Sequence, residues 1–228
     1  VGSEMCIRDR LKSSHILWIN LITDSLPALA LGVDEEENKS YMDRPPRGKD
    51  ESLFAGGGLN CTCFYGALIA LISMVAFLQL PVGILLRAGN QITPAAIRTL
   101  LVDTELLNRC QTYAFTVLGM SQLFHAIGMR DVETSLFRMN HLENRLMIAA
   151  FVIGMGLQLL VTEVPYFVVL FGTCRLTLLE WVKLLVLASM PLFAHELLVF
   201  GSCLGEKVNR ENRKEATGQA VSSGGRWS

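Results

Sequence analysis

The stretch TCFYGALIALISMVAFLQLPVGILL, residues 62–86, contains no charged side chain. Its polar side chains are those of Thr62, Ser73 and Gln79. About 20 such residues in helical form cross the ~30 Å hydrocarbon core of a bilayer. A helix in the core of a soluble protein is usually shorter and keeps one polar face. The stretch therefore predicts a transmembrane helix.

Four further apolar stretches resemble this one, and 51% of the whole chain is hydrophobic against 18% charged. We predict an all-α membrane protein, a bundle of about five transmembrane helices. The spans are expected at about 15–33, 62–86, 111–129, 146–172 and 178–201. The first span is the least apolar. The fourth should end near Tyr166, because Glu163 and Pro165 mark its approach to water.

The regions outside the spans define three expected parts. Residues 1–10, VGSEMCIRDR, begin without Met and resemble a translated sequencing adapter, with a native charged lead-in as the alternative. Residues 11–201 should form the membrane domain, and 202–228 a flexible cytoplasmic tail. Lys and Arg are concentrated in the tail and in connectors 34–58 and 130–145, which places these parts in the cytoplasm.

Several classes of function find no support in the residues. The net charge is −1 and no basic patch stands out, so no nucleic-acid partner is expected. Cys61 and Cys63 are too close in sequence for a zinc-ligand pair, and His195 is not followed by a second His at metal-binding spacing. Cys110 and Cys174 fall on the same expected side of the membrane, which leaves a disulfide between them open.

An acidic residue lies in the middle of the first span. An ionised Asp24 in lipid would cost several kcal/mol, so it marks either an ion site or a polar contact between helices. Helical spacing places Asn20, Thr23 and Asp24 on one face, and their hard oxygen donors suit Ca²⁺. Pro27 cannot donate to the carbonyl of Thr23. The helix should therefore be broken near Asp24–Pro27, with backbone oxygens free to face a cation.

Long motifs give these features a family context. LWINLITDSLPALALG at 17–32, followed by MDRPPR at 42–47, resembles the sixth membrane helix and following loop of P-type ATPases of the calcium-pump branch. TYAFTVLGMSQLFHA at 112–126 resembles the eighth helix, and LQLLVTEVP at 157–165 the ninth. The resemblance covers most of the chain from His15 to about Gly201.

The resemblance implies roles for particular residues. Asn20, Thr23 and Asp24 match positions that contribute to the family's calcium sites. Gln122 matches a position held by Glu in two-site reticulum pumps, and its neutral amide weakens the case for a second site. Its role stays open between a calcium ligand and a hydrogen-bonding residue of the bundle interior. The sodium-pump branch usually has a second Asp at the position of Asn20, which favours calcium.

We therefore expect a fragment of an ATP-driven calcium-exporting pump in a bacterial plasma membrane or an organelle membrane. Calcium is the transported ion, and ATP and Mg²⁺ act only in the intact parent. The chain has no catalytic residue of its own and no DKTGT motif, so it should be inactive without the parent's N-terminal helices and cytoplasmic domains. The alternatives are a monovalent-cation or proton P-type pump fragment and a non-enzymatic five-helix scaffold or channel subunit.

Overall fold

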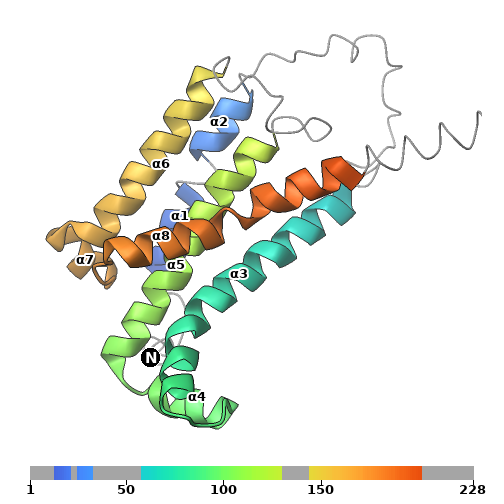
Figure 1. Ribbon diagram of the computed structural model, residues 1–228. Helices are drawn as coiled ribbons and strands as arrows, with labels where there is room; N and C mark the ends of the chain where they lie inside the picture. The colour runs from blue at the N-terminus through green and yellow to red at the C-terminus, as the bar shows by residue number, and fades with distance from the viewer. Residues whose placement is uncertain (1–12, 22–24, 33–57, 130–143, 202–228) are drawn as a thin grey trace, which may run out of the picture.

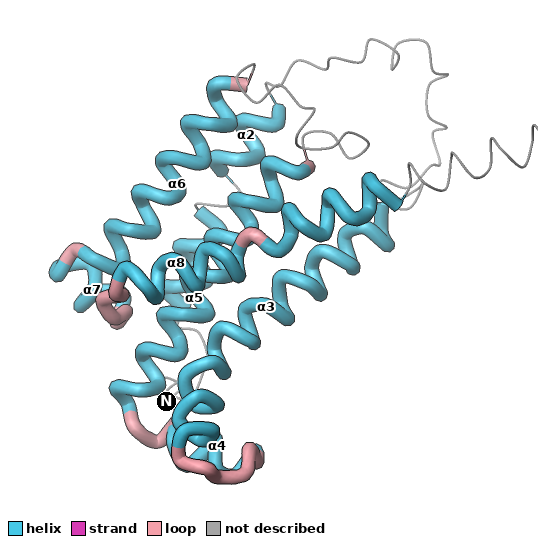
Figure 2. Tube along the Cα trace, viewed as in Figure 1, coloured by secondary structure: helices cyan, strands magenta, loops and turns pink. Residues whose placement is uncertain are grey.

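A computed structural model describes residues 13–21, 25–32, 58–129 and 144–201 (Figure 1). Regular structure in these ranges is helical, without a strand (Figure 2). The helices are α1 (Ser13–Asn20), α2 (Leu26–Gly32), α3 (Gly58–Arg87), α4 (Pro94–Leu100), α5 (Thr104–Gly128), α6 (Arg145–Glu163), α7 (Pro165–Phe171) and α8 (Leu178–Ala188). After a turn at Ser189, residues 190–201 are again helical.

Several helices have the length and composition of membrane spans. Three described segments are long and apolar enough to cross a bilayer: Gly58–Arg87, Arg145–Glu163 and Leu178–Gly201. Large apolar side chains on the outer surface are widely exposed, as at Val169 (82%) and Leu197 (72%). Apolar surface of this extent is typical of proteins that face lipid. The prediction of an all-α membrane protein is confirmed.

Helix α5 lies at the centre of the bundle and contacts α1, α2, α3, α6 and α8 (Figure 1). It covers the expected span 111–129 and, at 25 residues, is about 38 Å long. Its buried side chains include polar ones, among them Thr112, Thr116 and Ser121. A central helix can carry such residues because they face other helices, where hydrogen-bond partners are available, and not lipid.

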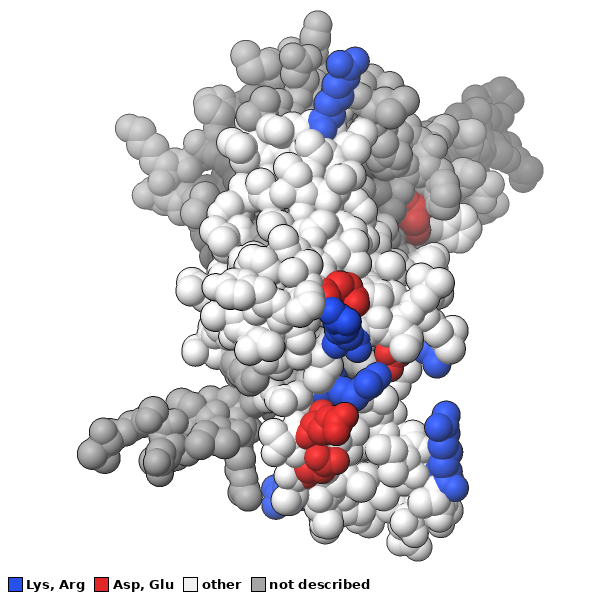
Figure 3. Space-filling model, turned by 90° about the vertical axis from the view of Figure 1, so that its left-hand side faces the viewer, with Lys and Arg blue, Asp and Glu red and all other residues white. Residues whose placement is uncertain are grey.

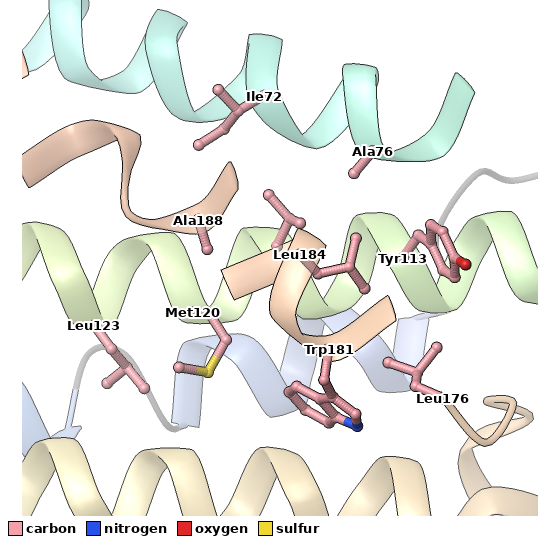
Figure 4. Close-up of a cluster of buried hydrophobic side chains, with 10 residues drawn as sticks. Ile72, Ala76, Tyr113, Met120, Leu123, Leu176, Trp181, Leu184 and Ala188 are labelled. Atoms are coloured by element: carbon pink, nitrogen blue, oxygen red, sulfur yellow. The ribbon is translucent and has the colours of Figure 1, made fainter. Parts of the chain in front are cut away.

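An apolar core joins α5 to α3 and α8 (Figure 4). Met120 of α5 and Leu184 of α8 are almost fully buried in it. Ala76 of α3 and Ala188 of α8 are fully buried as well. Small residues at these positions let the helix backbones approach closely, which favours dispersion contacts in the absence of a hydrophobic driving force in lipid. The core therefore fixes three of the helices around one another.

Ionisable side chains near the helix ends join α5, α6 and α8. Arg109 and Tyr113 of α5 both donate to Glu180 Oε1 at 2.5 Å. Trp181 Nε1 donates to Glu163 of α6 at 2.9 Å. On the face shown in Figure 3, most of the coloured Lys, Arg, Asp and Glu side chains gather toward one end. Among them, Arg109, Glu163 and Glu180 hold the ends of neighbouring helices together.

Two expected spans are divided in the structure. The range 146–172 changes direction at Val164, because Pro165 has no N–H to continue α6 and instead begins α7. Helix α7 ends at Gly172, which has the left-handed φ of 63°. The range 178–201 is interrupted at Ser189, two residues before Pro191. Pro165 and Pro191 thus lie at interruptions of two apolar stretches, whereas Pro81 lies inside the continuous helix α3.

Candidate ion-binding site

The helix that carries the predicted ligands is divided into two segments. α1 ends at Asn20 and α2 begins at Leu26, with Pro27 as its second residue. Leu21 and Ser25, on either side of residues 22–24, have π-helical hydrogen bonding. Such turns interrupt the regular hydrogen bonds of an α-helix and are frequent at functional sites. Residues 22–24 lie outside the described residues, so the break predicted near Asp24–Pro27 stays a prediction.

The predicted ligands are described only in part. Thr23 and Asp24 lie outside the described residues. Asn20 is exposed at the end of α1, and the preceding Ile19 is buried against Phe115 of α5. No contact between Asn20 and Gln122 is present in the described part of the chain.

Gln122 of α5 lies along the helix between the contacts with α1 and α2. Phe115 packs against α1, and Ile127 packs against the cluster around Ala30 of α2. Gln122 is half-buried, and its Oε1 is buried without a hydrogen-bond partner among the described residues. A buried oxygen without a partner costs about 1–3 kcal/mol, so its presence calls for a ligand or another function. Gln122 therefore offers such an oxygen on α5, between the contacts of this helix with α1 and with α2.

Helix α1 is held in place through a buried histidine. His15 Nε2 donates to the Phe171 carbonyl at the end of α7 at 2.9 Å. The ring of His15 also lies against Phe115 of α5, with 4.5 Å between the ring centroids. Both aromatic rings are fully buried. These contacts hold α1 to α5 and α7.

Helix α2 is held in place by a different residue. Asn144 Nδ2 donates to the Ala30 carbonyl in the last turn of α2 at 3.0 Å. Asn144 Oδ1 accepts from the Met147 N–H at 2.8 Å and so caps the start of α6. Asn144 is buried, which makes loss of either hydrogen bond costly. Helix α5 contacts both α1 and α2, but the buried hydrogen bonds join α1 to the end of α7 and α2 to the start of α6.

A second buried glutamine supports the same region of α5. Gln158 Nε2 of α6 donates to Thr116 Oγ1 at 3.3 Å. Gly119, one turn further along α5, lies next to this contact, and a Cβ there would be 3.4 Å from Gln158 Oε1. Gln158 therefore joins two helices, whereas the Gln122 oxygen has no such partner among the described residues.

Other candidate metal sites find no support. Within the described ranges, no group of three or more His, Cys, Asp or Glu side chains is placed to hold a metal ion. Cys110 and Cys174 are not joined by a disulfide. Cys61 and Cys63 are likewise in the thiol form. The oxygens at the break of the first span remain the candidate for binding a cation.

The sequence interpretation did not identify His15 or Asn144 as anchors. Asn144 carries a local signal, because Asn directly before the apolar run of α6 is a typical helix cap. Gln158 also carries one, as the single polar side chain between Leu146 and Val161. His15 has no comparable signal, since its partner is 156 residues away.

Known proteins resemble most of this chain. Residues 10–200 match the family described as "Cation transporting ATPase, C-terminus". A calcium-transporting ATPase 1 of Bacillus cereus is 35% identical over 189 residues, covering 82% of this chain and 20% of that protein. A calcium-transporting ATPase of Bacillus subtilis is 33% identical over 193 residues, covering 85% and 19%.

A more distant relative extends the similarity to plants. The endoplasmic reticulum-type calcium-transporting ATPase 3 of Arabidopsis thaliana is 26% identical over 210 residues, covering 88% of this chain and 21% of that protein. The chain thus spans about a fifth of the length of the curated relatives it matches. The family match and the bacterial relatives together show that this chain belongs to the C-terminal region of the cation-transporting ATPases.

Proposed function

We propose that the chain is part of an ATP-driven calcium-exporting pump and supplies part of its intramembrane calcium site. The ligands are Asn20, Thr23 and Asp24, with Gln122 as a further oxygen donor. The observation that supports this most directly is the buried Gln122 Oε1, which has no hydrogen-bond partner among the described residues and lies on α5, the helix that contacts both α1 and α2. The bacterial relatives are named as calcium-transporting ATPases, which favours calcium over other cations.

The proposed ligands match the chemistry of calcium. Ca²⁺ binds about six to eight oxygens, from carboxylates, amides, hydroxyls and backbone carbonyls. Asp24 supplies charge, Asn20 and Gln122 supply amide oxygens, and the interrupted helix frees carbonyls near Thr23. These groups are too few for a complete site. The remaining ligands come from N-terminal helices of the same parent protein.

Coupling to ATP requires parts outside this chain. Cytoplasmic domains of the parent would bind ATP with Mg²⁺ and form and break an aspartyl-phosphate. Their movement is transmitted to the membrane helices. Since His15 anchors α1 and Asn144 anchors α2 to different helices, the two segments can shift relative to each other and expose the ion to each side in turn. This chain alone is inactive.

The proposal includes a location and an orientation. The protein lies in the plasma membrane of a bacterium, with residues 11–201 as its membrane domain and the tail 202–228 in the cytoplasm. Lys and Arg in the connectors and the tail support this orientation. Residues 1–10 and the tail lie outside the described residues.

The test is Asp24→Asn in the whole protein. Removing the charge at the site should abolish calcium-dependent phosphorylation by ATP while membrane insertion stays normal, because Asn fits the same space. Asp103→Asn is the matched control, since Asp103 is an exposed cap of α5 away from the site. Unchanged calcium affinity in Asp24→Asn contradicts the proposal.

The same assay separates the rival functions. A monovalent-cation or proton pump would show ATPase activity stimulated by Na⁺, K⁺ or acid and not by Ca²⁺, with the same loss in Asp24→Asn. A scaffold or channel subunit would show no cation-stimulated phosphorylation in any variant. Calcium stimulation that Asp24→Asn removes and Asp103→Asn retains is the result that we expect.

A further inference from the structure

Helix α7 and the residues that follow it form a turn between the end of α6 and the start of α8 (Figure 1). Two residues near the end of α6 close this turn by hydrogen bonds. Glu163 Oε1 accepts from the Leu176 N–H at 3.3 Å, and the Val161 carbonyl accepts from Thr173 Oγ1 at 2.7 Å. The same Glu163 oxygen accepts from Trp181 Nε1 of α8 at 2.9 Å. The turn is therefore bonded to both of the helices that it connects.

Phe171, the last residue of α7, is the point at which this turn contacts α1. Its carbonyl accepts the hydrogen bond of His15 at 2.9 Å, and its ring packs edge-on against Trp18, with 5.0 Å between the centroids. Asn20, one of the proposed calcium ligands, follows His15 by five residues on the same helix, about 7.5 Å along its axis. A displacement of the turn would therefore be transmitted to this ligand through α1.

We propose that Glu163 is a positioning residue for calcium binding: by closing the turn it holds Phe171 in place, and through Phe171 it sets the position of α1 and Asn20. This role needs an acceptor oxygen at position 163 and not a negative charge, because both donors to Glu163 are neutral N–H groups. The inference rests on the proposed calcium site, since Asn20 is one of its ligands.

The chain offers variants that separate this role from a loss of packing. Glu163→Leu removes the acceptor, whereas Glu163→Gln keeps an amide oxygen that can accept the same hydrogen bonds. Thr173→Val breaks the other closure of the turn, so it tests the same element if Glu163→Leu does not fold. Thr162→Val is the matched control, because Thr162 is also buried but its Oγ1 donates to carbonyls of its own helix, α6.

The experiment measures calcium activation of phosphorylation by ATP in the whole protein, so that the parent's other helices are present. Glu163→Leu and Thr173→Val should each lower the calcium affinity about five-fold. Glu163→Gln and Thr162→Val should stay within about two-fold of wild type. Equal losses in Thr162→Val and Glu163→Leu overturn the proposal, because general loosening of α6 would explain them. Equal losses in Glu163→Gln and Glu163→Leu also overturn it, because the charge would then matter and not the hydrogen bonds.

A double-mutant cycle with Asn20→Ala tests whether Glu163 acts through α1. The combined loss of affinity in Asn20→Ala with Glu163→Leu should be smaller than the product of the two single losses. A combined loss equal to that product overturns the role of Glu163 while leaving Asn20 as a ligand. Unchanged calcium affinity in Asn20→Ala alone would instead contradict the ligand assignment, and this inference with it.

Discussion

Gln122 can act either as a calcium ligand or as a packing residue, and the two roles predict different hydrogen bonding of its side-chain amide. A packing residue should be paired, as Gln158 is with Thr116. A ligand should keep an oxygen available, as Gln122 does among the described residues. The half-buried Gln122 and the buried Gln158 lie on the neighbouring helices α5 and α6. Comparing them separates the cost of losing a hydrogen bond from the cost of losing an ion contact.

We predict that Gln122→Leu lowers the calcium affinity of the whole protein several-fold with little change in stability. Leucine has a similar volume and removes an oxygen that already lacks a partner among the described residues, so the free energy of unfolding should hardly fall. Calcium activation of phosphorylation and the thermal midpoint in detergent measure the two effects.

Gln158→Leu is the matched control for this prediction. It removes the donor to Thr116 and should cost about 1 kcal/mol in stability, with calcium affinity unchanged. If Gln122→Leu behaves in the same way as Gln158→Leu, Gln122 is a residue of the bundle interior and not a ligand.

Among the helices, α2 depends on the side chain of Asn144 for its position in the bundle. Asn144 combines a cap for α6 with a hydrogen bond to the Ala30 carbonyl. Asn144→Ser keeps a good capping oxygen but loses the amide donor to Ala30. We predict a loss of about 1 kcal/mol in stability together with weaker calcium binding, because α2 would no longer be held in place. Thermal unfolding and calcium-dependent phosphorylation of the whole protein measure these two quantities.

Asp103→Ala provides the comparison for Asn144→Ser. It removes a cap from α5 at an exposed position and breaks no bond between elements. It should lower stability by a similar amount, about 0.5–2 kcal/mol, without affecting calcium. Weaker calcium binding in both variants would show that general destabilisation, and not the position of α2, controls the site.

The elements also show what sequence can and cannot reveal. Uncharged runs predicted the long helices, because hydropathy is read from consecutive residues. The break that Pro27 predicts stays a prediction, because residues 22–24 lie outside the described residues. The anchors His15–Phe171 and Asn144–Ala30 join residues 156 and 114 positions apart. Such pairs depend on how helices pack, which local pattern does not encode. Thr23 and Asp24 stay predictions, as they lie outside the described residues.

For the whole molecule, the direction of calcium transport depends on which side of the membrane the connectors and the tail face. If connectors 34–58 and 130–145 face the cytoplasm, the Asn144 anchor of α2 lies on the cytoplasmic side and the His15 anchor of α1 on the outer side. If the chain had the opposite orientation, the His15 anchor of α1 would lie on the cytoplasmic side and the Asn144 anchor of α2 on the outer side. Calcium from the cytoplasm would then reach the site past α1.

Labelling of single cysteines decides between these orientations. In a background with native cysteines replaced by serine, Asn90→Cys lies in the exposed turn after α3, and Ser222→Cys lies in the tail. A membrane-impermeant maleimide should label Asn90→Cys on intact cells and Ser222→Cys only after permeabilisation, because Lys and Arg retain the tail in the cytoplasm. Each variant controls for the reactivity of the other after permeabilisation. The reverse pattern would place the α2 anchor outside the cell and contradict export driven from the cytoplasm.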